Sequence, residues 1–142
     1  MPVTTVSEVH SLTIRNDLAE VGRTLTWVDD LVEPLELSPE ATYAVQLCLG
    51  EAVVNIISYA FEPNTRHDVR IEVWRDGKMV FAEIIDDGRP FDPRAQQAPQ
   101  QPADLESAQI GGLGITLMRN FATDIAYRRT GGTNRLTLSF AA

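Results

Sequence analysis

The chain has 142 residues, and its 20 acidic and 12 basic residues give a formal net charge of −8. This length favours a single domain over residues 1–142 with one hydrophobic core. The acidic balance and the scatter of the basic residues argue against nucleic-acid binding, and the apolar runs are too short to predict a membrane span. The N-terminus shows no secretion signal, and the single cysteine fits a reducing compartment, so we expect a cytoplasmic protein.

The N-terminal part of the chain predicts a strand and then an amphipathic helix. Residues Glu8 to Ile14 alternate weakly between polar and apolar, which indicates the strand. Apolar residues then recur at spacings of three and four, as on one face of a helix; they are Leu18, Val21, Leu25, Val28 and Val32. This helix should stop near Pro34, because proline interrupts the helical hydrogen-bond ladder.

A second helix has a clear start signal. Ser38 is a good N-cap, Pro39 suits the first helical position, and the negative charge of Glu40 suits the positive end of the helix dipole. The helix should run to about Ala60 or Phe61. It is apolar over most of its circumference, which predicts deep packing.

One row of this second helix is small or polar; its members are Ala44, Cys48, Glu51, Asn55 and Ser58. Glu51 and Asn55 lie one turn apart on the same face. A carboxylate and an amide among apolar neighbours need partners, which a ligand or a metal would provide. A structural role, as a cap or beside a solvent-filled groove, explains the pair equally well from the helix alone.

A β-hairpin follows, with strands at Val69 to Trp74 and Met79 to Ile85 and a turn at Asp76-Gly77. Asp86-Asp87-Gly88 comes directly after the second strand. A carboxylate in this position can accept a hydrogen bond, and glycine permits a close approach. Taken alone, however, Asp-Gly is more often a simple turn.

Between residues 92 and 111 the sequence is rich in Pro, Gln and Ala and has no periodicity, so we interpret it as a flexible lid over a bound ligand. It leads into a glycine run at the start of a helix, where backbone N–H groups and the helix dipole can hold phosphate. The run consists of Gly111, Gly112, Leu113 and Gly114.

The chain ends in a second hairpin, in which Ile125 and Tyr127 precede a Gly131-Gly132 turn and Leu136, Leu138 and Phe140 follow it. The order of elements predicts an α/β (α+β) two-layer sandwich. Its sheet should be mixed but mostly antiparallel, with helices on one face.

Together, three segments resemble the asparagine box and the two glycine boxes of one ATP-binding fold; they are Glu51 to Asn55, Asp86 to Phe91 and Gly111 to Ile115. That fold is shared by gyrase, the ninety-kilodalton heat-shock chaperone, histidine kinases and mismatch-repair ATPases. The sequence is most similar to a small, free-standing branch of this superfamily, the bacterial anti-sigma-factor serine kinases. The resemblance covers roughly Leu12 to Phe140.

The resemblance implies a role for each matching position. Asn55 would bind the Mg²⁺ that bridges the ATP phosphates, and Glu51 would be the general base. Asp86 and Gly88 would form the adenine pocket. The backbone N–H groups of Gly112 to Gly114 would hold the phosphates.

The chain also departs from the family pattern. Tyr59 replaces a histidine that commonly follows the asparagine box, and Asn134 stands where a threonine commonly helps to fix the adenine edge. No lysine or arginine occurs between Ala95 and Ile110. A cation for the γ-phosphate would therefore have to come from Arg94, Arg119 or a partner protein.

Three classes of function remain open at this level. The resemblance favours a serine kinase that binds a sigma factor and phosphorylates an anti-sigma-factor antagonist, using ATP and Mg²⁺. An ATP-binding switch without phosphate transfer and a pure interaction module are the alternatives. The resembling kinases commonly form homodimers, so the resemblance implies a homodimer here as well.

Overall fold

The computed structural model describes residues 6–95 and 116–142. Its elements, in chain order, are β1 (His10–Arg15), a 3₁₀ turn η1 (Leu18–Glu20), α1 (Val21–Leu35), α2 (Pro39–Tyr59), β2 (Asp68–Asp76), β3 (Met79–Asp86), a 3₁₀ turn η2 (Pro93–Ala95), β4 (Asp124–Thr130) and β5 (Thr133–Ala141). The backbone over residues 116–121, just before β4, is also helical.

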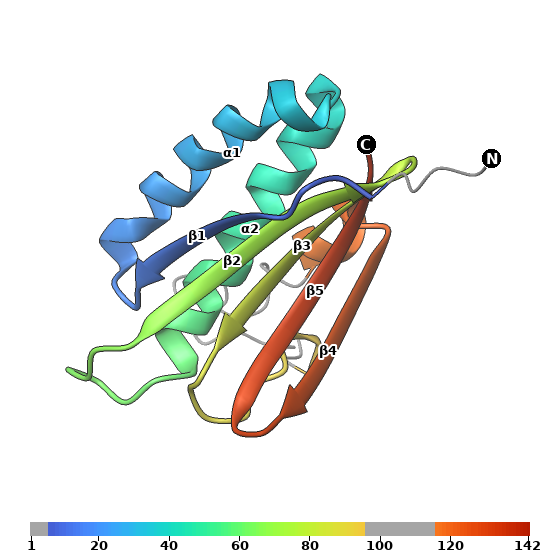
Figure 1. Ribbon diagram of the computed structural model, residues 1–142. Coiled ribbons are helices and arrows are strands. Elements are labelled where there is room, and N and C mark those ends of the chain that lie inside the picture. Colours follow the sequence, from blue (N-terminus) through green and yellow to red (C-terminus); the bar gives the residue numbers. More distant parts are fainter. Residues whose placement is uncertain (1–5, 96–115) are drawn as a thin grey trace.

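The described strands form one five-stranded sheet in the order β1-β2-β3-β5-β4, and each neighbouring pair is antiparallel. The expected mixed sheet is thus antiparallel throughout the described residues. Figure 1 shows α1 and α2 side by side on one face of the sheet, while the other face carries no helix in the described part of the chain. The predicted two-layer α+β sandwich is confirmed.

The first helix ends near Pro34 as predicted but differs from its prediction in its buried face. α1 includes Pro34 and ends at Leu35, and its C-cap residue Glu36 has a left-handed backbone with φ 51°. The side chains that α1 buries are Thr24, Val28, Leu31 and Leu35. Only Val28 of the predicted stripe is fully buried, because the helix also turns part of its apolar surface toward α2 rather than toward the sheet.

The second helix agrees closely with its prediction. Ser38 Oγ accepts the Ala41 N–H at 3.0 Å, Pro39 is the first helical residue, and the helix ends at Tyr59. By length and by its mean hydropathy of 1.3, α2 could cross a membrane, which the short apolar runs had not suggested. Half of that apolar stretch is buried in this domain, so packing in the core accounts for its composition.

The middle of the sheet brings the sequence motifs together. β3 pairs with β2 on one side and with β5 on the other, and its core-facing residues Val80, Ala82 and Ile84 are fully buried. β3 ends at Asp86, which is paired across the sheet with Asn134 of β5. The loop after β3 then packs against the C-terminal end of α2, where the Arg89 N–H donates to the Ala60 carbonyl at 2.8 Å.

Candidate functional site

The polar row of α2 is only partly buried: Ala44, Cys48 and Asn55 are buried, whereas Glu51 is half-buried and Ser58 is exposed. Asn55 is only 3% exposed, and Cys48, about two turns earlier, is fully buried. In the described part of the chain the Asn55 amide makes no side-chain hydrogen bond, and no side-chain polar atom sealed from solvent lacks a partner. The polar atoms of the amide are therefore not completely sealed from solvent, although the residue as a whole is buried.

Glu51 lies at the border between this row and an apolar groove. The groove has a volume of about 310 Å³, and Leu25, Tyr43, Leu47 and Val54 are among the residues that line it beside Glu51. Burial, with the Glu51 charge nearby, raises the pKa of the Cys48 thiol to about 12. The thiol is thus protonated and inert at neutral pH.

The loop after β3 holds its aspartate in a fixed geometry. Asp86 is 4% exposed, and its Oδ1 accepts the Gly88 N–H at 2.8 Å and an N–H of the Asn134 amide at 3.0 Å. No hydrogen bond to Oδ2 is found among the described residues, so this oxygen is not completely sealed from solvent, by the same reasoning as for Asn55. One carboxylate oxygen is held and the other is free to accept.

Burial raises the pKa of Asp86 above its ordinary value of 3.8, because the charged carboxylate loses contact with water. The hydrogen bonds from Asn134 and Gly88 oppose this effect by stabilising the charge. The neighbouring Asp87 adds to the increase, and Arg129 opposes it. A buried acceptor with a raised pKa is typical of a binding position rather than of a surface turn.

Gly88 is required by close packing. A Cβ atom at this position would lie 2.4 Å from the Ala60 carbonyl oxygen and 2.9 Å from the Ala60 Cβ. The glycine therefore lets the loop touch the end of α2, and this contact fixes the position of the Asp86 corner relative to Asn55. Asp86 and Asn55 come from segments more than thirty residues apart in the sequence, and the contact at Ala60 is made only in the folded chain.

Asn134, which is predicted to contact the nucleotide, is hydrogen-bonded within the chain. It is 2% exposed, and its amide nitrogen donates to Asp86 and, at 2.8 Å, to the Arg89 carbonyl. Its amide oxygen accepts from the Tyr127 hydroxyl and from Arg129 Nη1. Sequence analysis did not select Tyr127 or Arg129 for the site. The alternation of β4 could have found them, because it places both on the core-facing side, next to the Asn134 strand.

The phosphate side of the predicted site is only partly described. The run Gly111 to Gly114 lies outside the described residues, and so does most of the predicted lid. The helix that follows the run is present over residues 116–121, with Met118 fully buried. Of the two candidate lid cations, Arg94 is held by Asp92 through Nε–Oδ1 and Nη2–Oδ2 contacts of 3.0 and 2.9 Å, and Arg119 donates to the Arg94 carbonyl.

Among the described residues, no group of three or more His, Cys, Asp or Glu side chains could hold a metal ion. Asn55 offers a single amide oxygen. Mg²⁺ keeps several waters and is commonly bound by one or two protein ligands together with substrate phosphates, so a lone Asn55 oxygen fits a metal that arrives with a nucleotide.

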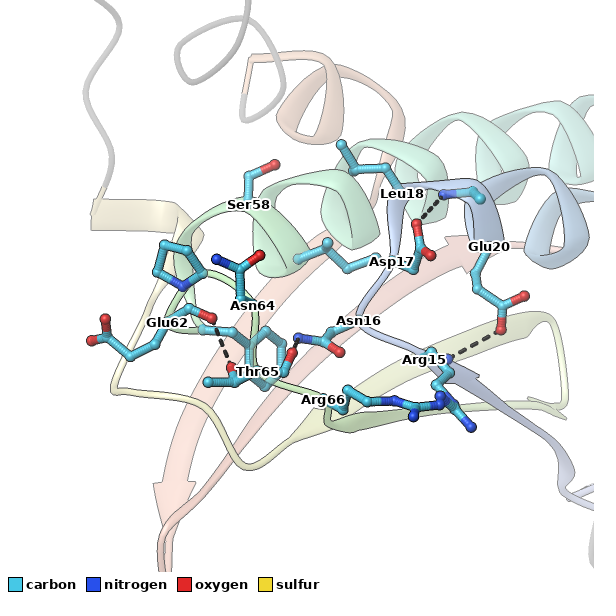
Figure 2. A pocket seen from close by; sticks show the side chains of 14 residues that line it. Arg15, Asn16, Asp17, Leu18, Glu20, Ser58, Glu62, Asn64, Thr65 and Arg66 are labelled. Carbon is cyan, nitrogen blue, oxygen red and sulfur yellow. Dashed lines mark hydrogen bonds between the residues drawn. The ribbon is translucent and has the colours of Figure 1, made fainter.

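The large cavity in Figure 2 lies away from these residues. It has a volume of about 810 Å³ and lies between the segment that joins β1 to α1 and the segment that follows α2. Its polar groups are largely paired within the chain: Asn16 donates to the Thr65 carbonyl at 2.9 Å, and Asp17 accepts from the Ala19 N–H at 3.0 Å. None of the residues predicted to bind nucleotide lines it.

Comparison with known proteins identifies the family of this chain. Residues 14–140 match the family model described as a histidine kinase-like ATPase domain, and the chain belongs to this family. It is 32% identical to the serine/threonine-protein kinase BtrW of Bordetella bronchiseptica over 115 residues, and this aligned stretch covers 81% of each chain. It is 25% identical to the serine-protein kinase RsbW of Listeria monocytogenes over 92 residues, and this aligned stretch covers 62% of this chain and 59% of the relative.

A search of solved structures found the histidine kinase AdeS of Acinetobacter baumannii, with a TM-score of 0.48, 14% sequence identity, and coverage of 95% of this chain and 68% of that one. The family match confirms the predicted superfamily. The two relatives are both named as protein kinases that act on serine or threonine, which agrees with the predicted kinase branch.

Proposed function

We propose that this protein is an ATP-dependent serine/threonine kinase that regulates a sigma factor by phosphorylating an anti-sigma-factor antagonist. The observation that carries the proposal is the pairing of a free buried acceptor, Asp86 Oδ2, with the open Asn55 amide on α2. Ala60 contacts the Asp86 loop and lies five residues from Asn55, roughly 7–8 Å along the helix. A nucleotide that lies along α2 would have its purine ring at Asp86 and its phosphates at Asn55.

Each residue has a distinct part in the proposed reaction. The Asp86 carboxylate accepts from the adenine amino group, and Asn55 together with the backbone N–H groups of Gly112 to Gly114 holds the phosphates and their Mg²⁺. The metal, when bound, offsets the negative charge of the phosphate oxygens. Glu51 takes the proton of the substrate hydroxyl as the oxygen of that hydroxyl forms its bond to the γ-phosphorus and the bond to ADP breaks.

The proposed partners are proteins: a sigma factor, the antagonist that carries the acceptor serine, and a second copy of this chain in a cytoplasmic homodimer. Exposed aromatic side chains support contacts with proteins. Tyr43 is 59% exposed and Phe121 41% exposed, and their rings pack edge to face at 5.7 Å. Exposed apolar groups that cluster in this way are typical of docking surfaces.

The first experiment tests nucleotide binding. Thermal unfolding is followed with and without millimolar ATP and Mg²⁺, and we expect the unfolding temperature to rise only when both are present. No shift at millimolar nucleotide would remove every function that depends on ATP and leave an interaction module.

The second experiment tests phosphate transfer. The protein is incubated with γ-labelled ATP, Mg²⁺ and a candidate anti-sigma-factor antagonist, and the label is located by mass spectrometry. We expect it on one serine of the antagonist. Binding of ATP without any label on the partner would contradict the kinase.

A second candidate function is an ATP-dependent switch that transfers no phosphate. The specific observation in its favour is the ion pair between Arg94 and Asp92, because it occupies a cation that could otherwise approach the γ-phosphate. Under this alternative, ATP would stabilise the fold and change affinity for a protein partner, and the partner would stay unlabelled.

A further inference from the structure

Three polar side chains lie in one row across neighbouring strands at the end of the sheet. Asp86 of β3 is paired directly with Asn134 of β5, and Asn134 is paired directly with Arg129 of β4. Directly opposed residues of antiparallel strands have Cβ atoms roughly 4.5–5.5 Å apart, close enough for their side chains to interact. Tyr127 lies two residues before Arg129 on the same face of β4 and reaches the row diagonally.

Asn134, at the centre of the row, has no hydrogen-bonding capacity left. An asparagine side chain offers two N–H donors and an oxygen with two lone pairs. The donors go to Asp86 Oδ1 at 3.0 Å and to the Arg89 carbonyl at 2.8 Å. The oxygen accepts from the Tyr127 hydroxyl and from Arg129 Nη1 at 2.9 Å. A nucleotide could contact this amide only by displacing one of these partners.

Arg129 connects the row to the loop that follows β3. Its Nη1 donates to the Gly88 carbonyl at 2.9 Å as well as to Asn134. The guanidinium therefore fixes the loop from one side while the amide fixes the carboxylate from the other. Tyr127 and Arg129 also decide which way the Asn134 amide points, because both require its oxygen on their side.

This network fixes the orientation of the Asp86 carboxylate. Oδ1 is occupied by two N–H donors, from Gly88 and Asn134, and Oδ2 is left open. If the Asn134 amide turned over, its oxygen would face Asp86 Oδ1 and repel it, and the carboxylate would be free to rotate. The orientation of the open acceptor thus depends on residues that do not themselves reach it.

We infer that Asn134 is a positioning residue rather than a nucleotide ligand. Through it, Tyr127 and Arg129 hold Asp86 Oδ2 ready to accept the amino group of a purine, and so select adenine over purines with a carbonyl in that place. The inference rests on the proposed binding of ATP and adds to it the residues that set base selectivity.

The test compares ATP with inosine triphosphate, which carries the same phosphates but a carbonyl group in place of the amino group. Dissociation constants for both are measured by calorimetry with Mg²⁺ for the wild type, Tyr127→Phe and Arg129→Gln. We expect the wild type to prefer ATP and each variant to lose about fivefold to tenfold of that preference, mainly through weaker ATP binding.

Arg128→Gln is the matched control. Arg128 is exposed, belongs to the same strand as Arg129 and carries the same charge. It lies on the opposite face of the sheet from Arg129, where it is paired with Arg135 of β5. We expect the control to keep the wild-type preference. Arg129→Lys, which keeps the charge and a donor, should recover part of the selectivity that Arg129→Gln loses.

The outcomes separate the inference from the proposed function. If the wild type bound neither nucleotide, the proposed function and the inference would both be wrong. Equal binding of the two nucleotides by the wild type would overturn the inference alone. Variants that weaken the binding of both nucleotides by the same factor would also overturn it, since a purely structural role would lower both affinities without changing their ratio.

Discussion

The two halves of the candidate site differ in how completely the chain itself holds them. At the Asp86 corner, almost every polar atom has a partner within the protein, from Gly88, Asn134, Tyr127 and Arg129. On the α2 face, the Asn55 amide has no side-chain partner among the described residues, and Glu51 borders an apolar groove. The first half is preorganised, whereas the second is completed by whatever binds.

This contrast assigns different jobs to the two halves. A preorganised acceptor selects one ligand at little cost in ordering, because its geometry is set before binding. Groups that must meet phosphates, a metal and a protein hydroxyl in turn benefit from being open. Changes at the corner should therefore affect stability and base selectivity, and changes on the α2 face should affect transfer.

The largest expected effect comes from Glu51→Gln. Glutamine keeps the shape of the side chain but cannot take a proton, so phosphate transfer should fall by about 10²–10⁴-fold while ATP binding stays unchanged. Transfer is measured in single-turnover assays and binding by calorimetry. Glu40→Gln, in the first turn of the same helix, is the control. Normal turnover by Glu51→Gln would show that another group is the base.

Asp86→Asn tests whether the Asp86 side chain contacts the base of the nucleotide. The Asn side-chain oxygen can still accept from Gly88 and Asn134, but its NH₂ group then takes the place of Oδ2 and faces the adenine amino group, donor against donor. ATP affinity should fall about 100-fold, and inosine triphosphate, which presents a carbonyl, should bind better than ATP. Retained ATP preference would show that Asp86 does not contact the base.

The same variant should be more stable than the wild type at neutral pH. The pKa of Asp86 is raised in the folded protein, so ionisation of this group weakens the fold as pH rises through that pKa. Asparagine does not ionise, so the free energy of unfolding at pH 7 should increase. The gain should shrink toward pH 3.8, the ordinary value for aspartate, when urea unfolding is repeated in acid.

Gly88→Ala tests the contact that joins the two halves. The added Cβ would lie 2.4 Å from the Ala60 carbonyl oxygen, so the loop must move away from α2. We expect a loss of about 2 kcal/mol in the free energy of unfolding, measured in urea, and weaker ATP binding. Gly22→Ala in α1, where an added Cβ meets nothing within 4 Å, should leave stability unchanged or raise it by up to about 1 kcal/mol. Equal effects of the two substitutions would contradict the close-packing argument.

The smallest expected effect is a dependence of ATP affinity on pH. Because burial raises the pKa of Asp86, protonation should convert Oδ2 from an acceptor to a donor at a higher pH than for an exposed aspartate. ATP affinity should fall as the pH is lowered through that raised pKa, measured against inosine triphosphate to cancel titration of the phosphates. Arg129→Gln should move this change to higher pH, since Arg129 opposes and Asp87 adds to the raised pKa.

The elements with strong local signals were predictable from the sequence. The α2 boundaries follow from Ser38 and Pro39, and both hairpins follow from alternation and glycine turns. In the first hairpin, the turn residues are Gly77 and Lys78 rather than Asp76 and Gly77, because Asp76 still pairs with Met79. That shift of one residue depends on strand pairing, which the turn motif alone does not specify.

Where the sequence fell short, the reason was a contact between distant segments. The buried face of α1 depends on how the helix packs against both the sheet and α2. The role of Asn134 depends on Tyr127 and Arg129, and their charge or hydroxyl gave no sign of a shared partner. The glycine run and the lid remain predictions, because they lie outside the described residues.

The sequence by itself determined the class of the domain, the order of its elements and the chemical types available at each motif, since capping, periodicity and turn preferences act over a few residues. Only the tertiary structure decided which of those groups are free to meet a ligand. In the folded protein every hydrogen-bonding group of the Asn134 side chain has a partner, whereas one oxygen of Asp86 and the amide of Asn55 have none among the described residues. The close contact of Gly88 with Ala60 links the Asp86 loop to the end of α2. The physical reason is that hydrogen-bond partners and burial are set by packing between segments far apart in the chain.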